Sequence, residues 1–434
     1  MNITRARKII VFIFLFHFFA ANALCAKSTG EIINTITDVF KDFVDQNEGT
    51  TSFRSLYIPS GGKAEAMGSA FTALANDISF FEYNPAGSCQ IENTEFSIFH
   101  NSWIADSAVE TLAFTQRSNN LGYGAAIKCF YVPFTEYTIF GERVSKGYYS
   151  ETVITLNLSY NFFSGYTFKG LCIGGNFKTA FRSVPNYADN DTNKIILNSG
   201  NEQSAIAFIG DGGLLVRFNV LKFYSSREPN FKIGLAIHNV GIAFTGFSKK
   251  IKIDDPLPSY LSAGISASLI RPLTIALEFQ QPIHFQNLKE SEQWAASAGT
   301  SVVITPFFTL LGGFLLRGAN PRLTMGAELL FSDVIFNINY TLDMTTSLAP
   351  INRISLTAKI NLGDRGRDEL QIKIDTLYSI GLSLYANGDL VEAIDVWSQI
   401  LEYQPRFDPA IAGIESARSS LELERRISEV QMLD

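Results

Sequence analysis

The sequence predicts an all-β membrane barrel of about 14 antiparallel strands, with an N-terminal plug, or hatch, in the lumen and a small α-helical tail. Three observations carry this prediction: a long period-2 alternation of apolar and polar residues, a small-residue segment before it, and a start typical of exported proteins. The expected domains are a signal peptide at 1–26, a helix and hatch at 27–94, the barrel at 95–363 and a periplasmic helical repeat tail at 364–434.

The alternation defines the strands. Ile154, Leu156 and Leu158 alternate with Thr155 and Asn157, and thirteen further runs behave similarly. The expected strands are 95–103, 107–116, 121–132, 152–163, 168–182, 204–219, 230–240, 259–269, 272–281, 293–304, 307–317, 320–330, 333–343 and 352–362. A run of about ten residues rises roughly 33 Å and, tilted about 45°, crosses the apolar band of an outer-membrane barrel.

A soluble sandwich would also alternate. Two features favour the membrane barrel. The polar faces are rich in Asn, Ser, Thr and Gly rather than Lys and Glu, and charged residues make up only 18% of the chain, below the roughly 25% of soluble domains. The long connections 133–151, 183–203 and 241–258 all follow odd-numbered strands, so they are expected outside the cell if both termini are periplasmic.

The N-terminus has the features of a secretory signal peptide, with Arg5, Arg7 and Lys8 before an apolar run and an Ala21-Asn22-Ala23 site. Lipidation at Cys25 is the alternative. The chain is therefore expected in the outer membrane of a diderm bacterium. Removing three cations takes the net charge from −7 to about −10, which argues against a nucleic-acid partner.

Residues 60–88 are the expected hatch. The segment is rich in Ala and Gly and contains Asn84-Pro85, so only 66–75 is expected to be helical. Gly61, Gly62 and Gly87 are candidate hinges. A phosphate-binding loop is the alternative, but no such motif is present. A further alternative is a static plug, which seals the barrel and only stabilises it. The candidate ligand-contacting residues are the aromatics Phe71, Phe80, Phe81 and Tyr83.

Two helical regions flank the barrel. Residues 28–45 have an amphipathic 3.6-residue period, with a possible capping box at Ser28 and Glu31. Residues 374–407 resemble one tetratricopeptide repeat, and an ordinary helical hairpin is the alternative. The repeat motif is carried by Leu377, Gly381, Leu384, Gly388, Ala393, Trp397 and Pro405. Because a lone repeat cannot bury its own face, it is expected to lean on the barrel or on a periplasmic protein partner.

The segment from Ala64 to Gly87 resembles the FadL-type long-chain fatty-acid transporters, in particular an uncharacterised spirochaetal branch. Weaker support comes from Asp211-x-Gly213. The resemblance implies a hatch beside a hydrophobic pocket, a fatty-acid-like ligand and a lateral opening in the barrel wall. The implied hatch and gate residues are Met67, Gly68, Asn84, Pro85, Ala86 and Gly87, together with the hinges Gly61 and Gly62.

Two functions follow as hypotheses. The first is an outer-membrane transporter for hydrophobic small molecules, plausibly long-chain fatty acids. The alternative is a non-transporting outer-membrane anchor whose tail recruits envelope or secretion partners. No nucleophile, base or metal set can be assembled, because His100, His238 and His284 stand alone in the sequence. Cys89, Cys129 and Cys172 form no C-x-x-C motif. No enzyme activity, cofactor or metal is expected.

Overall fold

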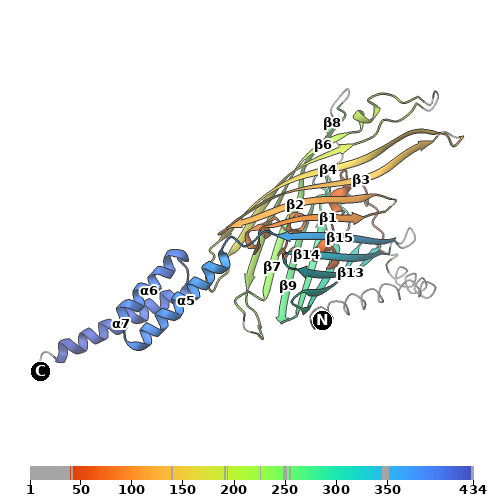
Figure 1. The fold of residues 1–434 in the computed structure, drawn as a ribbon. Coiled ribbons are helices and arrows are strands. Elements are labelled where there is room, and N and C mark those ends of the chain that lie inside the picture. The colour runs from red at the N-terminus through yellow and green to blue at the C-terminus, as the bar shows by residue number, and fades with distance from the viewer. Residues whose placement is uncertain are drawn as a thin grey trace.

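The computed structural model describes residues 40, 43–104, 106–137, 140–189, 192, 194–224, 226–247, 252–253, 256–344 and 351–431. Fourteen antiparallel strands form a closed barrel (Figure 1). They are β1 (Glu95–Ser102), β2 (Ala108–Ser118), β3 (Leu121–Tyr137), β4 (Arg143–Phe162), β5 (Leu171–Ser183), β6 (Ala205–Phe218), β7 (Phe231–Thr245), β9 (Tyr260–Ile270), β10 (Leu273–Pro282), β11 (Ala295–Thr305), β12 (Phe308–Arg317), β13 (Asn320–Phe331), β14 (Val334–Asp343) and β15 (Ile351–Asn361). The predicted strand number is confirmed.

Each strand pairs with its neighbour in the sequence, and β1 pairs with β15 to close the ring, with Ile98 opposite Ala358. The short β8 (Lys252–Ile253) pairs only with the end of β7. Because each of the fourteen ring strands has two partners, the ring is closed.

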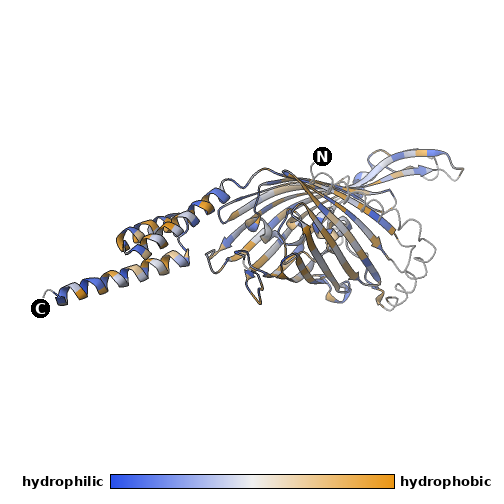
Figure 2. Ribbon diagram, turned by 60° about the horizontal axis from the view of Figure 1, so that its bottom comes forward, coloured by the Kyte–Doolittle hydropathy of each residue, from blue (hydrophilic) through white to orange (hydrophobic). Residues whose placement is uncertain are grey.

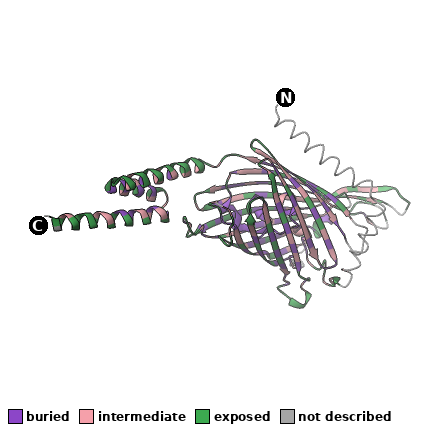
Figure 3. Cartoon of the chain, turned by 90° about the horizontal axis from the view of Figure 1, so that it is seen from below, coloured by how far each residue is buried: buried purple, intermediate pink, exposed green. Residues whose placement is uncertain are grey.

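The apolar face of the sheet points outward. Leu156 is 56% exposed, whereas its neighbour Asn157 is 5% exposed, and the same contrast repeats around the ring (Figures 2 and 3). A water-soluble sheet would show the reverse arrangement. The expected orientation, with apolar side chains facing outward and polar side chains facing the lumen, is therefore confirmed. Within the described residues, no helix has both the length and the apolar character needed to cross a bilayer.

The β3–β4 hairpin differs from the prediction. Most of residues 133–151, expected as a loop, continue β3 and β4 as a two-stranded ribbon. Proline in the middle of a sheet removes a ladder hydrogen bond. Tyr131 is the last β3 residue paired with β2, so at Pro133 the strand has one free edge and tolerates a residue without an N–H. Similarly, β7 extends to Thr245, and η4 (Ser199–Glu202) interrupts the loop between β5 and β6.

Residues 52–91, here called the inner segment, lie inside the ring of strands. The segment contains η2 (Arg54–Tyr57), α3 (Gly62–Ala66), α4 (Phe80–Tyr83) and η3 (Pro85–Gln90), and nearly all of it is buried. It contacts opposite sides of the ring: Asn176 on β5 donates to Phe81 O at 2.9 Å, and Asn339 on β14 donates to Gly62 O at 2.7 Å. That this segment acts as a plug stays a prediction.

The prediction of a helix at 66–75 was wrong. Helix α3 ends at Ala66, and the chain then turns through left-handed residues at Gly68 (φ 65°) and Ser69 (φ 68°). Alanine propensity is a weak preference, and close packing against the wall overrides it here. The backbone of Gly68 lies directly against Gly313 on β12, which leaves no room for a continuous helix.

The C-terminal tail consists of α5 (Arg367–Asn387), α6 (Leu390–Tyr403) and α7 (Asp408–Gln431). Its core is built around the buried Trp397. The tail contacts the barrel at the β4–β5 turn, where Tyr166 N donates to Arg406 O at 3.0 Å and Thr167 Oγ1 donates to Asp408 at 2.6 Å. Helices are therefore present as expected, and their assignment to a repeat family stays a prediction.

The two ends of the barrel differ. The tail end carries the two-residue turns 119–120, 271–272, 306–307 and 332–333 and the longer connections 163–170 and 219–230, whereas the loop end carries the longest connection, 184–204, and one two-residue turn, 318–319. Both chain termini are expected in the periplasm, and residues 1–39 and 432–434 lie outside the described residues, so this stays a prediction. However, Asn47 donates to Lys289 O at 3.1 Å, and Ser52 N donates to Pro256 O at 3.0 Å. Residues 43–52 therefore lie at the loop end. The signal peptide and most of the helix expected at 28–45 fall outside the described residues.

Candidate functional site

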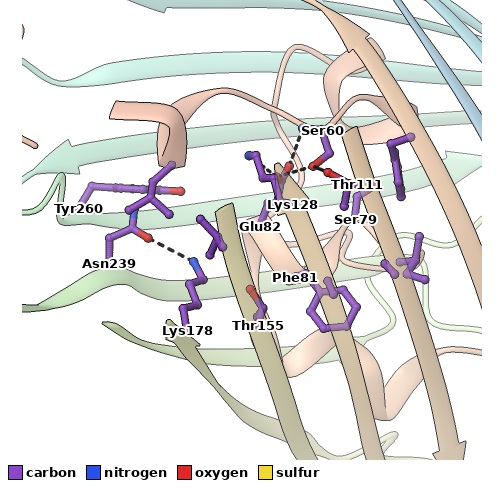
Figure 4. A pocket seen from close by; sticks show the side chains of 16 residues that line it. Ser60, Ser79, Phe81, Glu82, Thr111, Lys128, Thr155, Lys178, Asn239 and Tyr260 are labelled. Atoms are coloured by element: carbon purple, nitrogen blue, oxygen red, sulfur yellow. Dashed lines mark hydrogen bonds and ion pairs between the residues drawn. The ribbon is translucent and has the colours of Figure 1, made fainter. Parts of the chain in front are cut away.

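A small cavity lies between the inner segment and the barrel wall (Figure 4). Its volume is about 40 Å³, and its lining comes from the inner segment and from β1–β5, β7 and β9. A space of this size holds a few water molecules and not a long alkyl chain. The cavity therefore accepts a larger molecule only if the inner segment or its side chains move.

One side of the cavity is polar. Glu82 on α4 pairs with Lys128 on β3 at 2.6 Å and accepts hydrogen bonds from the backbone and hydroxyl of Ser60 at 3.0 and 2.8 Å. The Ser60 hydroxyl also lies 2.7 Å from Thr111 Oγ1 on β2. These bonds join two parts of the inner segment to two wall strands beside the cavity, as Figure 4 shows.

A second polar group borders the cavity at Lys178 on β5. Its ammonium pairs with Asp211 on β6 at 2.6 Å and donates to Asn239 at 3.1 Å. Asp211 also accepts from the backbone N–H of Asn239 at 2.8 Å. The β6–β7 ladder shifts register between Gly210 and Gly212, so this ion pair lies at an irregularity in the wall.

The rest of the cavity lining is largely apolar. Ile78 and Phe81 from the inner segment face Phe99, Ala113 and Ala126 from the wall. Among the four candidate aromatics, only Phe81 lines the cavity. Apolar walls with a few fixed polar groups are typical of small-molecule sites.

The other candidate aromatics are buried beside this site. Phe80 stacks on Phe81 with ring centroids 4.4 Å apart, and Phe71 meets Tyr83 edge to face at 5.8 Å. Phe71 and Tyr83 belong to a separate apolar cluster with Ala276 and Leu311 of the wall. These three rings therefore support the shape of the inner segment rather than line the cavity.

The Asn84-Pro85-Ala86-Gly87 motif fixes the path of the inner segment. The Asn84 amide donates to Thr72 O at 2.8 Å and to Leu214 O on β6 at 3.0 Å, and its oxygen accepts from Ala86 N at 3.1 Å. Asn84 thus joins two parts of the segment to the wall while capping η3. Pro85 occupies the first position of η3, where its missing N–H is not needed.

The candidate hinges are tightly packed. Gly61 (φ 120°) and Gly62 (φ 73°) adopt conformations that favour glycine. A Cβ at Gly62 would lie 2.9 Å from the Phe99 ring, and one at Gly87 would lie 2.5 Å from Phe80 Cβ. The sequence therefore needs glycine at these positions for conformation and for close packing.

Eight glycines of the barrel strands form a feature that sequence reasoning missed. At each of them, an added Cβ would come closer than 3.0 Å to the inner segment. These wall glycines are Gly122, Gly124, Gly174, Gly213, Gly234, Gly299, Gly313 and Gly326. Gly174 lies directly opposite Gly213 on the neighbouring strand, and Gly299 lies opposite Gly313.

Buried carboxylates also bond the inner segment to the barrel wall. Glu278 on β10 accepts hydrogen bonds from the backbone N–H groups of Phe71 and Thr72, each at 2.8 Å. Asp77 of the inner segment pairs with Lys359 on β15 at 3.0 Å. Breaking such buried bonds without replacement is costly, so the inner segment is held from several sides.

No group of three or more His, Cys, Asp or Glu residues arranged to hold a metal occurs among the described residues. In the tail, Gly381 and Gly413 pack so closely against the Trp397 ring that an added Cβ would lie within 3.0 Å of it. Gly388 ends α5 in the left-handed conformation with φ 89°. Leu377 and Leu384 pack against the Trp397 cluster, which includes Ala393. Pro405 follows the end of α6.

Comparison with solved structures gives matches to outer-membrane channels at low identity. A TodX monoaromatic hydrocarbon channel mutant, deltaS2S3, is 14% identical, with a TM-score of 0.44, covering 69% of this chain and 97% of that one. The KdgM porin is 9% identical, with a TM-score of 0.28, covering 62% and 99%.

Comparison with known protein sequences gives matches of higher identity. A UPF0164 protein of Treponema pallidum (strain Nichols) is 31% identical over 402 residues, covering 90% of this chain and 88% of the relative. A second UPF0164 protein of the same organism is 28% identical over 396 residues, covering 88% and 78%. Residues 28–365 match the family described as uncharacterised protein family UPF0164. This chain therefore belongs to the UPF0164 family.

Proposed function

We propose that this protein is an outer-membrane channel for hydrophobic small molecules, with long-chain fatty acids as the candidate substrate class. In this proposal the inner segment is a hatch that closes the lumen. The barrel places apolar side chains outward and polar side chains inward, which suits a bilayer around it. The tail end would face the periplasm and the loop end the exterior.

The observation that carries the proposal is the cavity between the inner segment and the wall. Its apolar side, formed by Phe81, Phe99 and Ala126, suits an alkyl chain or a ring, and Lys128 and Lys178 border it with cations. Both cations already have carboxylate partners, Glu82 and Asp211. Because the cavity holds only about 40 Å³, passage requires movement of the segment that lines it.

The β6–β7 irregularity is the proposed position of a lateral exit. The ladder shifts register around Asp211, and Asn239 opposite it has a left-handed φ of 57°. Bulges weaken pairing locally and often lie beside functional sites. Outward-facing Phe208 and Ile242 surround this point with apolar surface, so a molecule leaving here would enter the apolar layer of the membrane.

The test is uptake of radiolabelled oleate into vesicles that contain the purified full-length protein, compared with protein-free vesicles and with a labelled trisaccharide. We expect oleate to enter faster than in the control and the trisaccharide to be excluded. Equal oleate entry with and without protein would overturn the proposal. Rapid trisaccharide entry would identify an open porin instead.

A scaffold is the second candidate, and the tail carries it. Helices α5–α7 have their own core around Trp397, and they expose large apolar residues such as Ile372, Val391 and Leu423. Deleting residues 368–434 separates the two functions. If oleate uptake survives while envelope assembly in the native host is impaired, the tail has a recruiting role. Unchanged assembly would exclude that role.

A further inference from the structure

Two cations face each other at the tail end of the lumen. Arg217, near the end of β6, lies directly opposite Lys232, near the start of β7. Both are on the inward face, because Leu215 is buried two residues before Arg217 and Gly234, two residues after Lys232, meets Thr72 of the inner segment. Like charges directly opposite each other destabilise a pair of strands.

The arginine is buried and only partly bonded. Arg217 is 8% exposed, its Nη2 donates to Lys169 O at 3.2 Å, and its Nε has no hydrogen-bond partner. Among the described residues, no carboxylate forms an ion pair with Arg217 or Lys232 within 4.0 Å. A buried cation without a counter-charge is costly.

Further cations interact electrostatically with this pair. Arg117 on β2 interacts electrostatically with Arg217 and with Arg367, the first residue of α5, whereas Lys232 interacts with Lys63 of the inner segment. The carboxylates in the same neighbourhood are Glu92 and Glu228, which interact with Lys232, and Asp364 and Asp368, which interact with Arg367; none of them forms an ion pair with Arg217 or Lys232. Within the described part of the chain, Arg217 and Lys232 themselves therefore have no carboxylate in contact.

Three lumen lysines contrast with this pair. Lys359 pairs with both Asp77 and Glu328, Lys178 pairs with Asp211, and Lys128 pairs with Glu82. The fold thus supplies a carboxylate to each of these lysines and leaves the opposed pair on β6 and β7 without one. This difference indicates that the counter-charge comes from another molecule.

We propose that Arg217 and Lys232, supported by Arg117, bind an oxyanion, either a carboxylate or a phosphate, at the tail end of the lumen. A guanidinium beside an ammonium provides several charge-assisted donors for one anionic group. This inference rests on the proposed function at one point: the anion is taken to be the head of an amphiphile that passes through the lumen. Binding of the anion itself does not require transport.

The test measures equilibrium binding of labelled oleate and of labelled oleyl alcohol to the full-length protein in a neutral detergent. The variant is Lys232→Glu, which places a carboxylate opposite Arg217 and so supplies the missing counter-charge within the chain. We expect oleate binding to weaken about tenfold or more, oleyl alcohol binding to stay unchanged, and the thermal midpoint to stay equal or rise. A structural role for Lys232 would lower the midpoint instead.

The control variant is Arg322→Met, which removes another inward-facing cation but leaves Asp343 paired with Arg353 at 3.3 Å. We expect it to keep oleate affinity. Competition with inorganic phosphate and with phosphatidic acid identifies the source of the oxyanion: displacement by both indicates a site for any oxyanion, and displacement by phosphatidic acid alone indicates a headgroup site. Unchanged oleate affinity in Lys232→Glu, or an equal loss of oleyl alcohol affinity, would overturn the proposal.

If Lys232→Glu does not fold, the full-length Arg217→Gln variant tests the same site. It removes the charge and keeps a hydrogen-bonding side chain. We expect weaker oleate binding and unchanged oleyl alcohol binding, as before. Oleate affinity equal to that of the unmodified protein would again contradict the inference.

Discussion

Replacing Gly313 by alanine should loosen the inner segment without opening the ring of strands. The new methyl group would lie closer than 3.0 Å to backbone atoms of Met67 and Gly68. Those backbone atoms have little freedom, because Gly68 is left-handed and its N–H donates to Glu65 O at 3.0 Å. Overpacking of this kind costs about 1–3 kcal/mol, so the displaced state of the segment gains population by roughly 5- to 150-fold.

The matched control is Gly312→Ala in the same strand. Its Cβ would meet only Thr300 Oγ1 at 3.5 Å, which is an ordinary contact. Limited proteolysis of the inner segment and oleate uptake report its displacement, and circular dichroism reports the strands. We expect faster cleavage and faster uptake in Gly313→Ala alone, with equal β-strand signals in both variants. Equal cleavage in the two variants would refute the idea that the wall glycines hold the segment in place.

Three further predictions follow from other contacts. Cys89 and Cys172 belong to one buried cluster that joins the inner segment to β5; oxidation by diamide, which accepts two electrons and two protons as the disulfide forms, should leave oleate uptake unchanged because η3 is expected to stay against the wall, and loss of uptake after confirmed cross-linking would mean that η3 moves during passage. Glu278→Ala removes the acceptor of two inner-segment N–H groups, so we expect about 1–3 kcal/mol of destabilisation per unsatisfied buried group. Protease sensitivity of the inner segment measures this loss. Protease resistance equal to that of the unmodified protein would contradict the prediction. Trp397→Ala should lower the stability of the tail by about 3–5 kcal/mol. We expect the helical circular dichroism signal of the tail to be lost, while the heat-modifiable migration of the barrel in gel electrophoresis persists. A retained helical signal would show that the tail core does not depend on this ring.

The barrel could be predicted from the sequence because each strand residue meets only two environments. Leu156 and Leu158 face outward and Asn157 faces the lumen, so the period alone fixes the strand and its faces. The continuation of β3 past Pro133 could not be predicted, since proline normally ends a central strand and the free edge depends on where β2 stops.

The candidate site was only partly predictable. The hatch segment and Phe81 could be named from composition, but the helix expected at 66–75 ignored the wall that bends the chain at Gly68. Adjacent glycines at 312–313 are visible in the sequence. However, which of the two faces the inner segment depends on strand register and on a contact across the lumen. The like-charged pair of Arg217 and Lys232 is visible only once β6 and β7 are paired.

The contacts also indicate which part of the inner segment moves. Residues 66–73 and 84–88 lie against seven of the eight wall glycines, mostly through backbone atoms, so a shift of these residues brings them against a strand. Residues 78–82 border the cavity, where only the Phe81 ring meets a wall glycine, Gly124, and polar side chains such as Glu82 and Lys128 hold these residues there. Side-chain bonds of this kind can exchange partners, whereas backbone packing cannot. Opening is therefore expected to start at the Glu82–Lys128 pair, beside Phe81, rather than by release of the whole segment. Lys128→Met should raise the rate of oleate uptake while leaving the protease resistance of residues 84–88 unchanged, and cleavage at 84–88 in this variant would mean that the segment leaves the lumen as one unit.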